Sequence, residues 1–357
     1  MTATIDISTT IHSRLLSGID FSKSGYSVLA RHGQPLLLIP AGKLAARQTL
    51  ELYQPQSRIA RFAMAGLKTA CIATGVSKFL PKLGMEYRLG NEIQRGMPFD
   101  QTDIDEGRVG FLLCNPKHEC ARVIAIRTGD APRIIKWADA TGAKVVAQEA
   151  ASIQRLAERK LAGVPVVFED GGGTDGSRWF EMERLDASRI KSVADFRAVG
   201  LLSAWMGEER ENPAETDLLK SIWNAGEGSV RWKAPKSMSA LRVRKAVMHG
   251  DFAPWNLREK RGAASAIDWE WAREDGLAGV DLCYGLLQEA LLVHRLAPRR
   301  ALQAVLLAAT RTPAARAYLE QAGWADDLKA WLELGVAYQQ SKMSWPCPEL
   351  LEALKNL

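Results

Sequence analysis

The sequence predicts an α+β fold with two lobes, a small antiparallel-sheet lobe followed by a mainly helical lobe, and an extra N-terminal α/β segment. Three observations lead to this prediction. Short apolar runs bounded by turn residues dominate residues 96–186. Helical periodicity dominates residues 187–357, and residues 1–95 carry a hairpin pattern and two helical stretches of their own. A chain of 357 residues is long enough for all three parts.

The N-terminal segment begins with two apolar runs, residues 26–30 and 35–39, which predict a β-hairpin. Two helices are expected to follow, residues 44–53 and 56–74. Apolar side chains recur at helical spacing in the second of them, and basic residues fall on its other side. That basic face could meet an anionic surface, although a plain solvated face is the more ordinary interpretation.

The sheet lobe is expected to contain five strands around one helix. In chain order these are strands 109–114, 121–128 and 133–137, helix 144–158, and strands 164–169 and 179–185. The glycine run 171–173 lies between the last two strands, with no helix beginning behind it. We therefore expect an exposed turn there rather than a phosphate-binding loop.

The helical lobe is expected to contain six main helices, because apolar residues recur at helical spacing after residue 187. These are residues 193–206, 216–224, 281–295, 298–310, 313–322 and 325–342. Residues 257–259 and 264–267 interrupt the helices and predict a hairpin that turns at Lys260-Arg261-Gly262.

The composition is that of a globular protein with a mild positive charge of +6. Such a balance suits the binding of nucleotides or anionic molecules. No nucleic-acid-binding motif and no apolar run long enough to span a membrane is found, so neither partner is predicted. The five cysteines show no zinc-binding spacing. They predict reduced thiols and a cytoplasmic location, although Cys114 and Cys120 could face each other across a hairpin. The oligomeric state is left open.

The most informative motif is His249-Gly250-Asp251 followed by Asn256, with Asp268 after a short apolar run. The spacing from Asp251 to Asn256 is that of the catalytic loop of protein kinases, H-R-D-x-x-x-x-N. A carboxylate is ionised at neutral pH and can orient a hydroxyl and accept its proton, which is the role expected of Asp251. Phosphoryl transfer to a hydroxyl is therefore the predicted chemistry.

Asn256 and Asp268 are the expected magnesium ligands. Mg²⁺ prefers a few hard oxygen ligands and takes the rest of its coordination shell from phosphates and water. The hairpin between these residues would bring Asp268 back beside Asn256, so that both oxygens face one ion. His249 is expected to support the catalytic loop by bonding nearby backbone. For Asp281, a helix cap and a brace for the catalytic loop are both open interpretations.

Lys136 lies between apolar residues in an expected strand, and Glu149 lies on the next helix. A lysine in such a position needs an anionic partner. A Lys–Glu pair spanning strand and helix would direct the ammonium to nucleotide phosphates. Each residue taken alone is an ordinary surface charge, and the downstream motif favours the pair.

These residues resemble the aminoglycoside phosphotransferase/choline kinase family, the small-molecule branch of the bilobal protein-kinase-like fold. The resemblance covers about residues 101–290. It implies that Asp251 is the catalytic base, that Asn256 and Asp268 bind magnesium, and that Lys136, paired with Glu149, holds phosphates of ATP. It also implies a hinge near Met182, Glu183 and Leu185 whose backbone contacts adenine. Residues 1–95 lie outside the family core. Residues 113–120 lack the glycines of a phosphate-covering loop, so GTP stays an alternative nucleotide.

The acceptor is expected to be a small alcohol. Only a dozen residues separate Asp268 from Asp281, which leaves no room for the activation segment that binds peptides in protein kinases. Trp255, Trp271 and Arg273 lie beside the catalytic residues and are the expected acceptor contacts, since tryptophan faces suit sugars and quaternary ammonium groups.

We therefore expect an ATP- and Mg²⁺-dependent kinase for a sugar, an aminoglycoside-like polyol or an amino alcohol. The alternative is a pseudokinase that acts as a nucleotide-binding or regulatory module.

Overall fold

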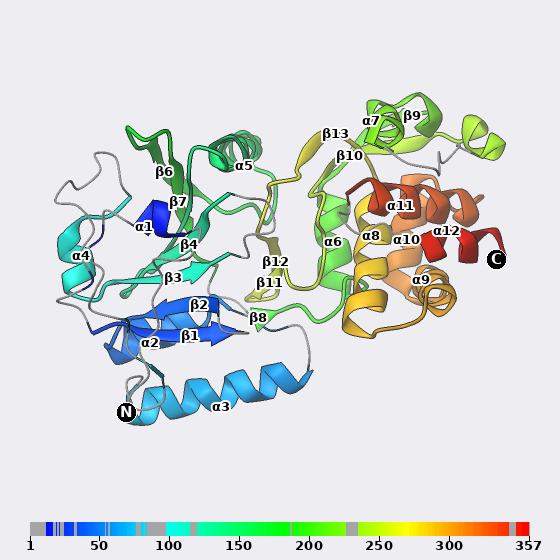
Figure 1. Ribbon diagram of the computed structural model, residues 1–357. Helices are drawn as coiled ribbons and strands as arrows, with labels where there is room; N and C mark the ends of the chain where they lie inside the picture. The colour runs from blue at the N-terminus through cyan, green and yellow to red at the C-terminus, as the bar shows by residue number, and fades with distance from the viewer. Residues whose placement is uncertain are drawn as a thin grey trace. The chain divides into compact units, whose positions relative to one another are not determined.

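The computed structural model describes most of the chain, and Figure 1 shows its ribbon. The described residues are 12–16, 19, 21, 25–31, 34–53, 55, 58–75, 80–81, 83, 98–114, 120–185, 188–225, 235–342 and 348–356. The chain divides into two compact units: Met1–Gln154 with Pro165–Arg184, and Arg155–Val164 with Leu185–Leu357. The predicted α+β class is confirmed, since antiparallel sheets and helices build both units.

An antiparallel sheet forms the centre of the first unit. Within the described residues it has seven strands, in the order β1-β2-β3-β4-β5-β7-β6. The strands are β1 (Ser27–Arg31), β2 (Gln34–Ile39), β3 (Val109–Leu113), β4 (Arg122–Arg127), β5 (Arg133–Ala138), β6 (Val167–Gly172) and β7 (Arg178–Glu183). The helices of this unit are α1 (Ser13–Leu16), α2 (Lys43–Leu50), α3 (Arg58–Thr74), α4 (Gln101–Asp105) and α5 (Ala143–Glu158). Strands β3, β4 and β5, helix α5, and strands β6 and β7 follow the predicted order.

The hairpin β1–β2 belongs to the same sheet, although residues 1–95 were expected to stand apart. Leu37 and Leu38 of β2 pair with Leu112 and Phe111 of β3. Leu37 and Leu38 are both fully buried, so both faces of β2 are covered. An isolated two-stranded hairpin could not bury both faces, which is why this one extends the larger sheet. Residue 95 is therefore not a boundary between compact units.

The glycine run contains strand rather than turn. Gly171 and Gly172 belong to β6 and pair with β7, so the expected turn begins only after them. A side chain at Gly171 would clash with the ring of Trp179, because its Cβ would lie 2.8 Å from that ring. Glycine is present here because the tryptophan packs against the backbone.

The second unit is mainly helical. Its helices are α6 (Phe196–Ala204), α7 (Asp217–Ala225), α8 (Val280–Gln288), α9 (Pro298–Arg311), α10 (Pro313–Ala322), α11 (Leu328–Lys342) and α12 (Pro348–Lys355), with 3-10 turns η2 (Pro213–Glu215) and η3 (Lys236–Ala240) and a π-helical turn η4 (Glu289–Val293). Two small sheets accompany them, in the strand orders β13-β10-β9 and β12-β11-β8. Their strands are β8 (Ser188–Arg189), β9 (Met206–Glu211), β10 (Val243–Met248), β11 (Leu257–Lys260), β12 (Ala263–Ala266) and β13 (Arg273–Leu277).

The expected helix 193–206 ends early. Helix α6 stops at Ala204, and β9 begins at Met206 and pairs with β10. Strand β9 reads MGEERE and its middle residues are exposed, since it lies at the edge of its sheet. An exposed edge strand has no apolar alternation, so its sequence gives no strand signal.

Helices α8 and α11 pack closely, and α8 carries residues of the candidate site. Gly335 of α11 lies against the side chain of Cys283 on α8, where any larger residue would clash. In the part of the chain that the structure describes, no helix is both long enough and apolar enough to cross a membrane.

Candidate active site

The catalytic motif forms a loop between β10 and β11 in the second unit. Gly250 has a left-handed backbone with φ of 83°, and a side chain there would clash with the carbonyl of Trp271. Both constraints call for glycine at this position. The backbone of Trp271 therefore packs against the catalytic loop at Gly250.

Asp281 braces this loop from helix α8. Its carboxylate accepts hydrogen bonds from the backbone N–H of His249 at 2.6 Å and of Gly250 at 3.0 Å. Burial raises its pKa to about 7, and these two hydrogen bonds act in the opposite direction. The residue that caps α8 is Gly279, without a side-chain bond. Of the two interpretations of Asp281, the structure supports the brace and not the cap.

Two indoles hold the turn that leads into α8. Trp324 donates to the carbonyl of Ala278 at 2.7 Å, and Trp331 donates to that of Gly279 at 2.9 Å. Both tryptophans are fully buried. These tryptophans are therefore core residues, and their hydrogen bonds position the start of α8.

His249 is fully buried among aromatic rings. Its ring stacks on Trp205 with an interplanar angle of 12° and lies 4.7 Å from the ring of Trp269. The Asp251 N–H donates to Nδ1 at 3.2 Å, so Nε2 carries the proton and donates to the carbonyl of Ile267 at 2.9 Å. His249 thus ties the catalytic loop to the segment that precedes Asp268, as predicted.

Asp251 is held by two side chains. The hydroxyl of Tyr284 donates to Oδ1 at 3.0 Å, and the amide of Asn256 donates to Oδ2 at 2.9 Å. Burial is the main cause that raises the pKa of Asp251 to about 6, and the charge of Asp268 is the second. The carboxyl is still mostly ionised at pH 7 and can accept a proton.

Asn256 and Asp268 are brought together by the predicted hairpin. Leu257 pairs with Ala266, and the N–H of Ile267 donates to the carbonyl of Asn256 at 2.9 Å. Arg261 and Gly262 make the turn with φ of 53° and 83°, the backbone of a tight hairpin turn. Since the amide nitrogen of Asn256 donates to both the carbonyl and the carboxylate of Asp251, its amide oxygen is directed away from them.

The chemistry of these two side chains suits a divalent cation. The charges of Asp268 and Glu270 both raise the pKa of Asp251, which shows that acidic side chains crowd this place. A bound Mg²⁺ would relieve that repulsion, and a carboxylate with an amide oxygen is a donor set that it accepts.

Lys136 and Glu149 form an ion pair in the first unit. The ammonium on β5 lies 2.7 and 2.9 Å from the two carboxylate oxygens on α5. The carboxylate is 1% exposed and the whole lysine 7%. A buried pair of this kind fixes the position of the ammonium. The expected strand-to-helix contact is present.

The expected hinge residues lie where the chain passes from the first unit to the second. Met182 is buried in β7, and the N–H of Glu183 donates to the carbonyl of Val166 at 2.8 Å. The division between the units follows Arg184, so Leu185 begins the second unit's part of the chain. Most of the glycine-free loop, residues 115–119, lies outside the described residues.

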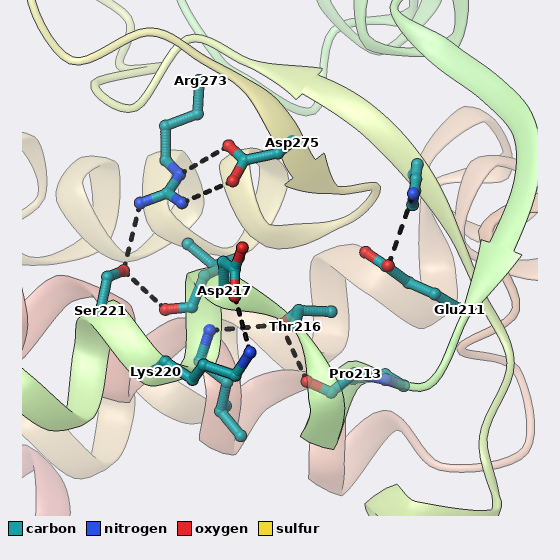
Figure 2. Close-up of polar contacts among 11 residues, drawn as sticks. Glu211, Pro213, Thr216, Asp217, Lys220, Ser221, Arg273 and Asp275 are labelled. Atoms are coloured by element: carbon teal, nitrogen blue, oxygen red, sulfur yellow. Dashed lines mark hydrogen bonds and ion pairs between the residues drawn. The ribbon is translucent and has the colours of Figure 1, made fainter.

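The expected acceptor contacts differ in their surroundings. Trp255 is partly buried and Trp271 is 47% exposed. Arg273 is engaged: its guanidinium binds the carboxylate of Asp275 at 2.9 and 3.2 Å and the hydroxyl of Ser221 at 3.2 Å (Figure 2). Figure 2 also shows that Ser221 lies on the helix of Asp217 and Lys220, so Arg273 joins β13 to α7.

Sequence reasoning missed two tyrosines. Tyr284 holds Asp251, and the hydroxyl of Tyr338 donates to the carbonyl of Gly250 at 3.2 Å. Tyr284 follows Asp281 by three positions on α8, and such a spacing places two residues on one helix face. That spacing is a signal by which Tyr284 could have been found. Tyr338 comes from α11 and has no such signal.

Comparisons with known proteins find similar folds. No family model and no curated protein matches this chain. Among solved structures, a thermostable mutant of the aminoglycoside phosphotransferase APH(4)-Ia, in complex with AMP-PNP and hygromycin B, is 13% identical, with a TM-score of 0.45 over 71% of this chain and 94% of that one. An ethanolamine kinase from Plasmodium vivax is 11% identical, with a TM-score of 0.41 over 72% and 83%. The amicoumacin kinase hAmiN is 11% identical, with a TM-score of 0.40 over 69% and 87%.

These matched proteins are small-molecule kinases by name, and the likeness is one of fold.

Proposed function

We propose that this protein is a phosphotransferase that moves the γ-phosphate of a nucleoside triphosphate to a hydroxyl of a small molecule. ATP is the proposed donor and GTP the alternative. The observation that carries the proposal is the geometry of Asp251. The carboxylate of Asp251, mostly ionised at pH 7, is held by Tyr284 and Asn256 on a loop braced by Asp281, and the charge of Asp268 acts on it.

Each residue has a proposed role. Asp251 orients the acceptor hydroxyl and takes its proton as the O–P bond forms. Asn256 and Asp268 would hold Mg²⁺, which supplies charge neutralisation on the phosphates. Lys136, fixed by Glu149, binds phosphate oxygens, and backbone near Met182, Glu183 and Leu185 binds the base. The short segment after Asp268 supports a small acceptor rather than a peptide.

The test is turnover of ATP and GTP with Mg²⁺ and a panel of sugars, polyols and other small alcohols. Asp251→Asn should lower kcat at least about a hundredfold, as is usual when a general base is lost. Asp217→Asn is the matched control, because that carboxylate is 73% exposed, belongs to the same unit and forms its ion pair with Lys220. Unchanged turnover in Asp251→Asn would refute the assigned base. Nucleotide binding without transfer to any acceptor would favour the pseudokinase alternative.

A further inference from the structure

One lysine, distant in the sequence from the catalytic loop, lies over the ring of Trp271, an expected acceptor contact. The ammonium of Lys342, in the last turn of α11, lies 4.0 Å from the ring centre of Trp271 and 5.4 Å from that of Tyr338. Among the described residues it makes no hydrogen bond or ion pair, and its further interactions there are with nearby charges. Within the described part of the chain, no acceptor oxygen is therefore bound to its three N–H donors.

The place of Lys342 is tied to the catalytic loop by several contacts. Trp271 presses its backbone against Gly250. Tyr338 donates to the carbonyl of Gly250 at 3.2 Å, and its ring lies 5.8 Å from that of Tyr284, which holds Asp251. The ammonium of Lys342 is thus linked to the proposed base, Asp251, through Tyr338 and Tyr284.

Several charged side chains act on the pKa of Lys342. The carboxylates of Asp281, Asp251 and Glu270 favour its ionised form, while Arg273 disfavours it. Burial is the largest effect and lowers the pKa of Lys342 to about 8, so the side chain remains mostly cationic at pH 7. One face of the Trp271 ring is therefore covered by a positive charge.

We infer that Lys342 binds an anionic group, a carboxylate or a phosphate, on the acceptor alcohol and disfavours acceptors that carry an amine. This inference rests on the proposed function and narrows its acceptor class. A tryptophan face without a lysine would suit an ammonium group. Here the protein's own ammonium covers that face, so a cationic acceptor meets like charge while an anionic one gains hydrogen bonds to a charged donor. Amino alcohols and aminoglycosides, which the sequence left among the expected acceptors, are thereby the disfavoured ones.

The first experiment compares acceptors that share one skeleton and differ in charge. Two such sets are glucuronate, glucose and glucosamine, and glycerate, glycerol and 2-amino-1,3-propanediol. The wild-type protein should prefer the anionic member to the amine by about ten- to a hundredfold in kcat/KM, as expected for hydrogen bonds to a charged group. Lys342→Met should remove this preference through KM, and Lys342→Arg should keep it. A preference for the amine, or an equal loss of kcat for every acceptor in Lys342→Met, would overturn the inference.

The second experiment needs no turnover. The fluorescence of Trp271 is taken as the difference between the wild-type protein and Trp271→Phe, and it is quenched with iodide or with caesium ions. Iodide should quench Trp271 more strongly than caesium in the wild type, and Lys342→Met should reverse the order because the acidic neighbours remain. Equal quenching by the two ions, or stronger quenching by caesium, would overturn the inference that a positive charge covers the Trp271 ring. Absence of turnover with every acceptor would instead count against the proposed function, and the quenching would still decide the charge of this face.

Discussion

The brace that Asp281 provides for the catalytic loop can be tested by Asp281→Asn. The two carboxyl oxygens accept the N–H groups of His249 and Gly250 at 2.6 and 3.0 Å. An asparagine offers one oxygen, and its NH₂ would face the second N–H. One buried donor is then left without a partner, which costs about 1–3 kcal/mol. We expect the variant to lose about that much stability at pH 5.

The cost of this substitution should fall as pH rises. The pKa of Asp281 is raised from 3.8 to about 7. Between these values the folded protein holds a proton that the unfolded chain releases, so the wild-type free energy of unfolding falls by about 1.4 kcal/mol per pH unit. The slope flattens as the pH reaches the folded-state pKa, so from pH 5 to pH 7 this amounts to about 2 kcal/mol. Asparagine does not titrate, so at pH 8 the variant should be as stable as the wild type or more stable.

The measurement is urea unfolding of both proteins from pH 5 to pH 8 without nucleotide or metal ions, together with turnover. Turnover should fall at every pH, because the loop loses one anchor even where stability is equal. Glu289→Gln is the control: this buried carboxylate accepts from Ser192 and Val193 at 3.0 Å and makes no contact with the catalytic loop. It should lower stability by about 1 kcal/mol and leave turnover unchanged. A stability difference between wild type and Asp281→Asn that stays constant or grows with pH would refute this reasoning.

Two further predictions concern buried groups elsewhere. Lys136→Met leaves Glu149 buried without its ammonium and should lower the free energy of unfolding by about 3–5 kcal/mol. The double variant Lys136→Met with Glu149→Leu should recover most of this stability but no turnover. If the double variant regained turnover as well as stability, the proposed phosphate role of Lys136 would be contradicted. Gly285→Ala should destabilise by about 1–3 kcal/mol and lower turnover, because its Cβ would clash with the carbonyl of Phe252 in the catalytic loop. Gly200→Ala is the control, because Gly200 lies in a helix with open space around it, and it should raise the free energy of unfolding by about 0.5–1 kcal/mol. If urea unfolding showed stability changes of the same sign for both glycine variants, the contact between Gly285 and Phe252 would be contradicted.

The sequence was informative wherever one local segment determines the geometry. The spacing between Asp251 and Asn256 lies within a single loop, and a two-residue turn in one hairpin returns the chain to Asp268. Strand β5 and helix α5 follow each other directly, which is why the Lys136–Glu149 pair was predictable. In each case the partner is close in the chain or in the next element, so pattern and spacing suffice.

The sequence was uninformative where the environment decides. Strand β9 is polar because it lies at an edge, and its residues resemble a helix end or a loop. The hairpin β1–β2 gives no sign of which sheet it joins, since strand pairing between distant segments leaves no local pattern. Asp281 was left between two interpretations because its hydrogen-bond partners precede it by about thirty residues.

Acceptor charge is the property for which this limit matters most. The motif around Asp251 predicts a type of reaction, and many small alcohols would fit the proposed base and metal ion. Selection among them depends on side chains that reach the same place from other elements. Trp271 alone suggested a site for sugars or ammonium groups, and Lys342 gave no signal as one basic residue at a helix end. Only the folded chain places that ammonium 4.0 Å from the ring. Because the same tryptophan would favour opposite charges with and without the lysine, we expect the contact between α11 and the segment after Asp268, rather than the motif around Asp251, to decide the charge of the proposed acceptor.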